Sequence, residues 1–176
     1  MVLRPPLRFA AASVLGLRFR PIGESDLPFL ERLYASTRAE ELAAVPWPPE
    51  AKQAFLAQQF RAQHAHYQLH YTDTDWLVIL SAGEAIGRLY IARWPHEHRV
   101  VDIAFLPEHR GQGLGGALMR DLVEEAGAAG KPLTIHVEKN NPARRLYARL
   151  GFRPIGESGV YDLMEWRADP RQVKTA

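Results

Sequence analysis

A cluster of glycines lies between a predicted strand and a predicted helix, in the segment Arg110-Gly111-Gln112-Gly113-Leu114-Gly115-Gly116. Glycine permits positive φ angles and close approach of the backbone, so successive N–H groups can converge on an anion. The start of the helix adds partial positive charge at the same place. The pattern therefore predicts a phosphate- or pyrophosphate-binding loop. It is not a nucleoside-triphosphate P-loop, because no Gly-Lys-Ser/Thr follows.

The same glycines fit two other interpretations. Gly111, Gly113 and Gly116 match the dinucleotide-binding pattern, with Glu138 at the end of the next predicted strand as the ribose-binding acid. However, residues 107–110 separate the first glycine from its strand, and too few residues follow Glu138 to complete a six-stranded sheet. A turn that only packs a helix tightly is the other interpretation, but three glycines and an arginine exceed that need.

A second motif predicts a short helix that ends at Gly-Phe. It is the segment Asn141-Pro142-Ala143-Arg144-Arg145-Leu146-Tyr147-Ala148-Arg149-Leu150-Gly151-Phe152. Two segments resemble the two signatures of the GNAT superfamily of N-acetyltransferases. One is this helix motif, and the other is Arg110-x-x-Gly113-x-Gly115 preceded by Phe105-Leu106-Pro107. The resemblance is close over residues 84–166, and over 17–80 it covers the order of elements alone. It implies an enzyme that moves the acetyl group of acetyl-CoA directly to a primary amine in a ternary complex, without a metal. A non-catalytic acyl-CoA-binding or regulatory domain with the same fold is the main alternative.

The resemblance also implies how the cosubstrate binds. The amides of the glycine loop would hold the pyrophosphate, with Arg110 bracing the loop. The pantetheine arm would pair with the strand before the loop, where that strand splays apart from the strand at 133–138. The cofactor-binding residues implied in this way are Ile103, Ala104, Phe105, Arg110, Gly111, Gln112, Gly113, Leu114, Gly115, Gly116, Asn141 and Tyr147.

Tyr147 is the expected catalytic acid. By the resemblance it protonates the departing CoA thiolate, and a phenol is not ionised at neutral pH and so can donate this proton. Tyr147 also shares a helix face with apolar residues, so packing in the core is its other interpretation. Asn141 is either a cofactor ligand or the helix N-cap before Pro142, and either Asn140 or Asn141 matches the family asparagine.

Three residues are candidates for the base that an acceptor amine needs before it attacks. They are Asp102, His136 and Glu138, because ionisable side chains in the middle of buried strands are unusual. Strand alternation predicts that Asp102 shares a face with Val100 and Ala104, and that His136 shares a face with Glu138. The alternatives are a hydrogen-bonded core histidine, and an enzyme that accepts a neutral amine or uses water.

The acceptor is not identified by any motif. Trp47, Tyr67 and Tyr71 lie in the region expected to wall the acceptor pocket, and they favour an aromatic or extended acceptor, although they fit core packing equally well. A small-molecule amine, an antibiotic, a polyamine and the N-terminus or a lysine of a peptide all remain open.

Hydrophobic periodicity predicts the order strand, two helices, three strands, helix, strand, helix and two strands. The predicted helices are 25–37, 50–67, 114–126 and 143–150. The predicted strands are 17–22, 75–80, 85–92, 100–106, 132–138, 152–155 and 160–166. This order implies an α+β fold of α/β type, in which about seven strands form a mixed sheet flanked by about four helices. Residues 100–138 would form a central, right-handed parallel strand–helix–strand crossover.

The length of 176 residues, with 47% hydrophobic and 24% charged residues, is typical of one globular domain. This domain is predicted at 17–168, after a flexible lead-in at 1–16 and before a tail at 169–176. The absence of cysteine excludes thiolate metal sites and cysteine nucleophiles. Two histidine pairs could be considered as metal ligands, His66 with His70 and His96 with His98. Neither pair has a third ligand at a recognisable spacing, so no metal is expected.

The net charge is only +2, which does not favour nucleic-acid binding. No apolar run is long enough to span a membrane, so the sequence predicts a cytoplasmic protein without a membrane partner. Related enzymes often form dimers, so a homodimer is possible.

Overall fold

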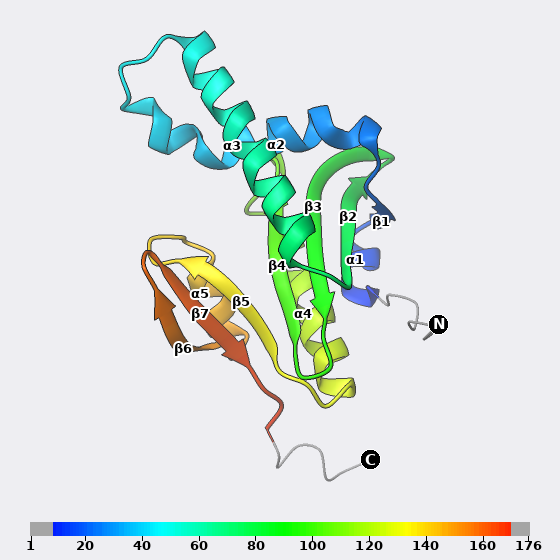
Figure 1. Cartoon of the computed structure of the whole chain (residues 1–176). Coiled ribbons are helices and arrows are strands. Elements are labelled where there is room, and N and C mark those ends of the chain that lie inside the picture. The colour runs from blue at the N-terminus through cyan, green and yellow to red at the C-terminus, as the bar shows by residue number, and fades with distance from the viewer. Residues whose placement is uncertain (1–8, 170–176) are drawn as a thin grey trace.

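The computed structural model describes residues 9–169, which form one seven-stranded sheet with helices on both faces (Figure 1). The strand order is β1-β2-β3-β4-β5-β7-β6. The strands are β1 (Leu17–Pro21), β2 (Thr74–Ser81), β3 (Glu84–Arg93), β4 (His98–Phe105), β5 (Leu133–Glu138), β6 (Arg153–Ser158) and β7 (Tyr161–Trp166). The α-helices are α1 (Ala10–Val14), α2 (Leu27–Ala43), α3 (Pro49–His70), α4 (Leu114–Ala128) and α5 (Arg144–Arg149). The predicted mixed sheet and its parallel crossover from β4 through α4 to β5 are confirmed.

The helices divide between the two faces of the sheet (Figure 1). One core lies between α2, α3 and the sheet and includes Leu30, Leu33 and Phe60. The other, larger core joins α1, α4 and α5 to the opposite face and includes Leu118 and Leu122. Helix α2 continues beyond its predicted end at Thr37 to Ala43, because it extends past the sheet in a helical hairpin with the start of α3, where no apolar face is required (Figure 1). Helix α3 exceeds its prediction mainly at its other end, at residues 68–70.

Helix α1 is an element that the sequence pattern does not predict. Ala12 is fully buried, and the carboxylate of Asp121 on α4 accepts hydrogen bonds from the amides of Ala11 and Ala12 at 2.8 and 2.9 Å. Amides at the start of a helix have no partner within it, so this carboxylate satisfies two of them and fastens α1 to α4. A flexible lead-in is therefore wrong for residues 9–14. Residues 1–8 and 170–176 lie outside the described residues.

Strands β4 and β5 are paired only at their beginnings. Pairing runs from His98 with Leu133 to Val100 with Ile135, although β4 continues to Phe105. Beyond that point the strands diverge into a V, as the resemblance predicts (Figure 1). The backbone groups of β4 that face β5 are therefore available to a ligand.

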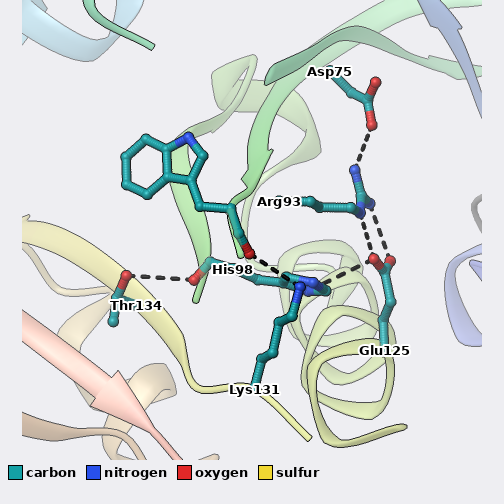
Figure 2. A network of polar contacts seen from close by, with 7 residues as sticks. Asp75, Arg93, His98, Glu125, Lys131 and Thr134 are labelled. Atoms are coloured by element: carbon teal, nitrogen blue, oxygen red, sulfur yellow. Dashed lines mark hydrogen bonds and ion pairs between the residues drawn. The ribbon is translucent and has the colours of Figure 1, made fainter. Parts of the chain in front are cut away.

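A polar network holds the closed end of this V (Figure 2). Arg93 on β3 forms ion pairs with Asp75 on β2 and with Glu125 on α4. His98, at the start of β4, lies with Nδ1 3.7 Å from Glu125, and Lys131 Nζ donates to the carbonyl oxygen of Trp94 at 3.0 Å. The network thus ties β2, β3 and β4 to α4 at the end of the sheet opposite the glycine loop.

We expect Gly87→Ala to destabilise the protein by about 1–3 kcal/mol, as overpacking in a core does. A Cβ at Gly87 would lie 2.4 Å from the carbonyl oxygen of Ala104 and 3.0 Å from the Phe105 ring, so β3 and β4 would have to separate. Urea unfolding measures the change. Gly156→Ala is the matched control in another strand, because its Cβ would meet nothing within 4 Å. Equal stability of the two variants would contradict this account of the β3–β4 contact.

Candidate active site

A cavity of about 190 Å³ lies where β4 and β5 diverge. Helices α2 and α3 contribute one wall, β3 and β4 another, and β5 with the start of α5 a third. The residues singled out from the sequence that line it are Tyr67, Asp102, Ile103, Ala104, His136, Glu138, Asn141 and Tyr147. Residues far apart in the chain therefore meet beside the diverging strands.

The glycine loop connects β4 to α4 at the open end of the V. Gly111 and Gly113 have φ angles of +71° and +80°, and Gly113 is the N-cap of α4. A Cβ on either would meet nothing within 4 Å, so the loop surface is open. Within the described part of the chain, the backbone amides of residues 111–116 have no hydrogen-bond acceptor. Six consecutive unpaired amides at the N-terminus of a long helix fit a pyrophosphate, as the sequence predicts.

Arg110 ties this loop to two elements. Its Nε donates to the carbonyl oxygen of Phe105 at 2.8 Å, and its Nη2 donates to Ser36 Oγ on α2 at 3.1 Å. The side-chain amide of Gln112 donates to the carbonyl oxygen of Glu108 at 2.6 Å. The side chains of Arg110 and Gln112 therefore shape the loop, while its amides stay available.

Tyr147 is buried and lines the cavity from α5. Its ring centroid lies 5.8 Å from that of Phe152, so the ring also belongs to the core. Burial raises the pKa of Tyr147 above its usual value, and the negative charge of Asp102 raises it further. The phenol therefore keeps its proton at neutral pH and is available as a donor.

Asp102 does not share a face with Val100, contrary to the prediction. A β-bulge lies between the pairs Tyr90–Asp102 and Ile91–Val100, so the alternation is interrupted at Val101. Val100 packs into the α4 core, whereas Asp102 lines the cavity on the other face. The bulge thus directs a carboxylate into the cavity.

His136 lines the cavity from β5, but its side chain is exposed, so the prediction of an ionisable group inside a buried strand is wrong for this residue. Partial burial lowers the pKa of its imidazole below the usual value, and the guanidinium of Arg99 lowers it further, while the carboxylate of Glu97 acts in the opposite direction. His136 is therefore mostly neutral at pH 7 and can accept a proton.

Glu138 already has two partners. Arg38 on α2 donates to its Oε1 at 2.9 Å, and the hydroxyl of Tyr161 on β7 donates to the same atom at 3.3 Å. The Arg38–Glu138 pair joins α2 to β5 across the cavity. The carboxylate of Glu138 is therefore already engaged by two donors from neighbouring elements.

Asn141 acts as a helix cap in the structure. Its Oδ1 accepts a hydrogen bond from the amide of Ala143 at 2.9 Å, while the residue also lines the cavity. The capping interpretation is thus confirmed for Asn141. Asn140 is exposed and does not line the cavity.

Several cavity residues come from elements that carry no sequence motif. They are Tyr34, Thr37 and Arg38 on α2, Gln63 on α3, Arg88 on β3 and Tyr161 on β7. The only signal in the sequence for Arg88 is a charged residue in an otherwise apolar strand, where burial requires a partner. The other five give no signal in the sequence, because Tyr34 has the pattern of a core residue and the rest have ordinary polar positions.

The aromatic residues predicted to wall the acceptor pocket divide into two groups. Tyr67 lines the cavity. Trp47 is 45% exposed and contacts Phe55 near the far end of the helical hairpin, and Tyr71 stacks on Trp94 with centroids 6.0 Å apart. The prediction is therefore wrong for Trp47, which lies in the helical hairpin beyond the sheet, and for Tyr71, which caps the C-terminal end of α3 and packs on Trp94 outside the cavity.

Among residues 9–169, no three His, Cys, Asp or Glu side chains are grouped so that they could hold a metal ion. The rings of His66 and His70 lie 4.3 Å apart on α3. None of the helices in the same range combines the length and apolar composition of a membrane-spanning segment.

Similarity to known proteins agrees with this site. The model of the acetyltransferase (GNAT) family matches residues 30–152. A Bacillus subtilis (strain 168) protein named for [ribosomal protein bS18]-alanine N-acetyltransferase activity is 33% identical over 114 residues, which cover 63% of this chain and 67% of that protein. The N-alpha-acetyltransferase RimI of Mycobacterium tuberculosis is 30% identical over 115 residues, and the match spans only 64% of its length and 63% of this chain.

Solved structures agree in fold. The PaiA N-acetyltransferase of Thermoplasma acidophilum, in complex with coenzyme A, superposes with a TM-score of 0.65 at 14% identity, covering 86% of this chain and 99% of that one. The spermidine N-acetyltransferase of Vibrio cholerae, in complex with CoA and spermine, gives a TM-score of 0.56 at 20% identity, covering 86% and 94%. The diverging strands, the loop of unpaired amides and the family match together place this chain in the GNAT family, and it is an acetyltransferase.

Proposed function

We propose that the protein transfers the acetyl group of acetyl-CoA directly to the α-amine of a peptide or protein N-terminus. The observation that carries the proposal is the cavity between the diverging β4 and β5, next to six unpaired amides at 111–116. The choice of acceptor rests on the two relatives, one named for acetylation of a ribosomal-protein alanine and the other for Nα-acetylation.

The residues present fit acetyl-CoA. The amides of residues 111–116 would hold the pyrophosphate, and the free backbone edge of β4 between Val101 and Phe105 would pair with the pantetheine arm. When bound, acetyl-CoA supplies an activated thioester. Hydrogen bonds from several amides would spread over both phosphates and stabilise their negative charge, so the proposal includes no metal.

Tyr147 and His136 divide the proton transfers between them. As the acceptor nitrogen forms its bond to the acetyl carbon and the bond from that carbon to sulfur breaks, His136 takes a proton from the nitrogen and Tyr147 gives one to the sulfur. His136 is preferred as the base over the carboxylates of Asp102 and Glu138, because each carboxylate is paired with an arginine, Arg88 or Arg38.

Release of free thiol from acetyl-CoA tests the proposal, and the protein contributes no background because it has no cysteine. We expect thiol release with a peptide that begins with alanine, and none with the same peptide blocked at its N-terminus. Tight CoA binding without transfer to any amine would indicate the non-catalytic alternative. Failure to bind CoA, or calorimetric binding of NADH in its place, would overturn the proposal.

A further inference from the structure

Arg88 and Asp102 form a buried ion pair in the cavity wall for which the transfer chemistry gives no role. Arg88 lies on β3 and is 3% exposed, and Asp102 lies on the neighbouring strand β4, in register with Tyr90. Arg88 Nη2 donates to Asp102 Oδ2 at 2.7 Å and to Gln63 Oε1 on α3 at 3.2 Å. Both residues line the cavity. Burying two charges is expensive, so a pair facing a cavity invites a functional explanation.

Both members of the pair have donor or acceptor atoms without a hydrogen-bond partner among the described residues. A guanidinium has five N–H donors, and within the described residues the buried Nε of Arg88 has no acceptor. On the acidic side, Asp102 Oδ1 accepts no hydrogen bond from the described residues, since its one such bond is to Oδ2. The cavity wall therefore offers unused donors beside an unused anionic acceptor.

We infer that Arg88 and Asp102 recognise an α-aminoacyl group, the neutral amino group through a hydrogen bond to Asp102 and the adjacent carbonyl oxygen through Arg88. This inference rests on the proposed function and names the chemical class of its acceptor. An α-amine always has a carbonyl group one carbon away, whereas the amines of a polyamine or a lysine side chain do not. An acceptor that lacks the carbonyl engages Asp102 alone, so Arg88 sets the preference for the N-terminus.

The test pairs one variant with two acceptors of similar size. Alaninamide carries the carbonyl, and sec-butylamine replaces the amide by an ethyl group. We expect Arg88→Met to lower kcat/KM for alaninamide about tenfold more than for sec-butylamine, which is the effect of one charged hydrogen bond. Differences in amine basicity cancel, because each acceptor is compared with itself in the two proteins. Equal losses for both acceptors would overturn the inference.

Arg93→Met is the matched control, because it also removes from β3 an arginine that is largely shielded from solvent and ion-paired with carboxylates (Figure 2). Arg93 lies at the closed end of the V and does not line the cavity, so its loss should affect the two acceptors equally. If Arg88→Met does not fold, Arg88→Lys keeps a cation beside Asp102 but lacks the planar fork, and the same selective loss is expected. Failure of wild type to acetylate any amine would instead count against the proposed function.

Discussion

Tyr147→Phe is expected to lower kcat for acetyl transfer by at least about 100-fold, in the range of general acid catalysis. The substitution removes only the hydroxyl, so the ring keeps its contact with Phe152 and the fold is preserved. Without a proton donor the sulfur must leave as a thiolate, so the loss falls on the chemical step. Steady-state kinetics with acetyl-CoA, together with calorimetric CoA binding, would give a low kcat and a nearly unchanged Kd.

Tyr34→Phe is the control for this prediction. Tyr34 is buried and lines the same cavity from α2, but it has no role in the proposed transfer. It should retain most of its kcat. A Tyr147→Phe enzyme as active as wild type would assign Tyr147 to core packing alone.

His136→Gln is expected to lower kcat at neutral pH by about 100-fold and to change the pH profile. The wild-type base works only when neutral, so kcat should fall as pH decreases through the pKa of His136, which lies below its usual value. Glutamine cannot take a proton, so the variant should lose the decrease of kcat at low pH, the acidic limb of the profile. The profile is measured on kcat, since kcat reports groups in the bound complex and excludes titration of the free amine.

Arg99→Gln provides a second check on the same limb. Arg99 lowers the pKa of His136 by its positive charge, so its removal should move the limb to higher pH while His136 stays in place. An acidic limb that persists unchanged in His136→Gln would assign the base to another group.

Those parts of the site that depend on local sequence were predictable. A glycine loop needs positive φ at fixed positions, and Gly111 and Gly113 provide it within three residues of each other. The helix after Asn141 likewise follows from its cap and its closing glycine. Such motifs are readable because their backbone geometry restricts which residues fit.

The acceptor side of the cavity was not predictable, because it depends on contacts between distant segments. Arg38 meets Glu138 across 100 positions of the chain, and no spacing within α2 indicates this partner. The bulge beside Asp102 is fixed by the register of β3 against β4, which strand alternation alone cannot supply. Burial of Arg88 required the same register, so its pairing with Asp102 emerged only in the folded chain.

The central claim is that the V between β4 and β5 directs acetyl transfer to an α-amine. The most direct measurement uses one peptide that begins with alanine and contains an internal lysine, so that both amines compete at the same concentration. Fragmentation mass spectrometry of the product after reaction with acetyl-CoA locates the acetyl group. We predict acetylation of the N-terminal nitrogen alone. Acetylation of the lysine in preference to the N-terminus, or of neither amine, would contradict the account.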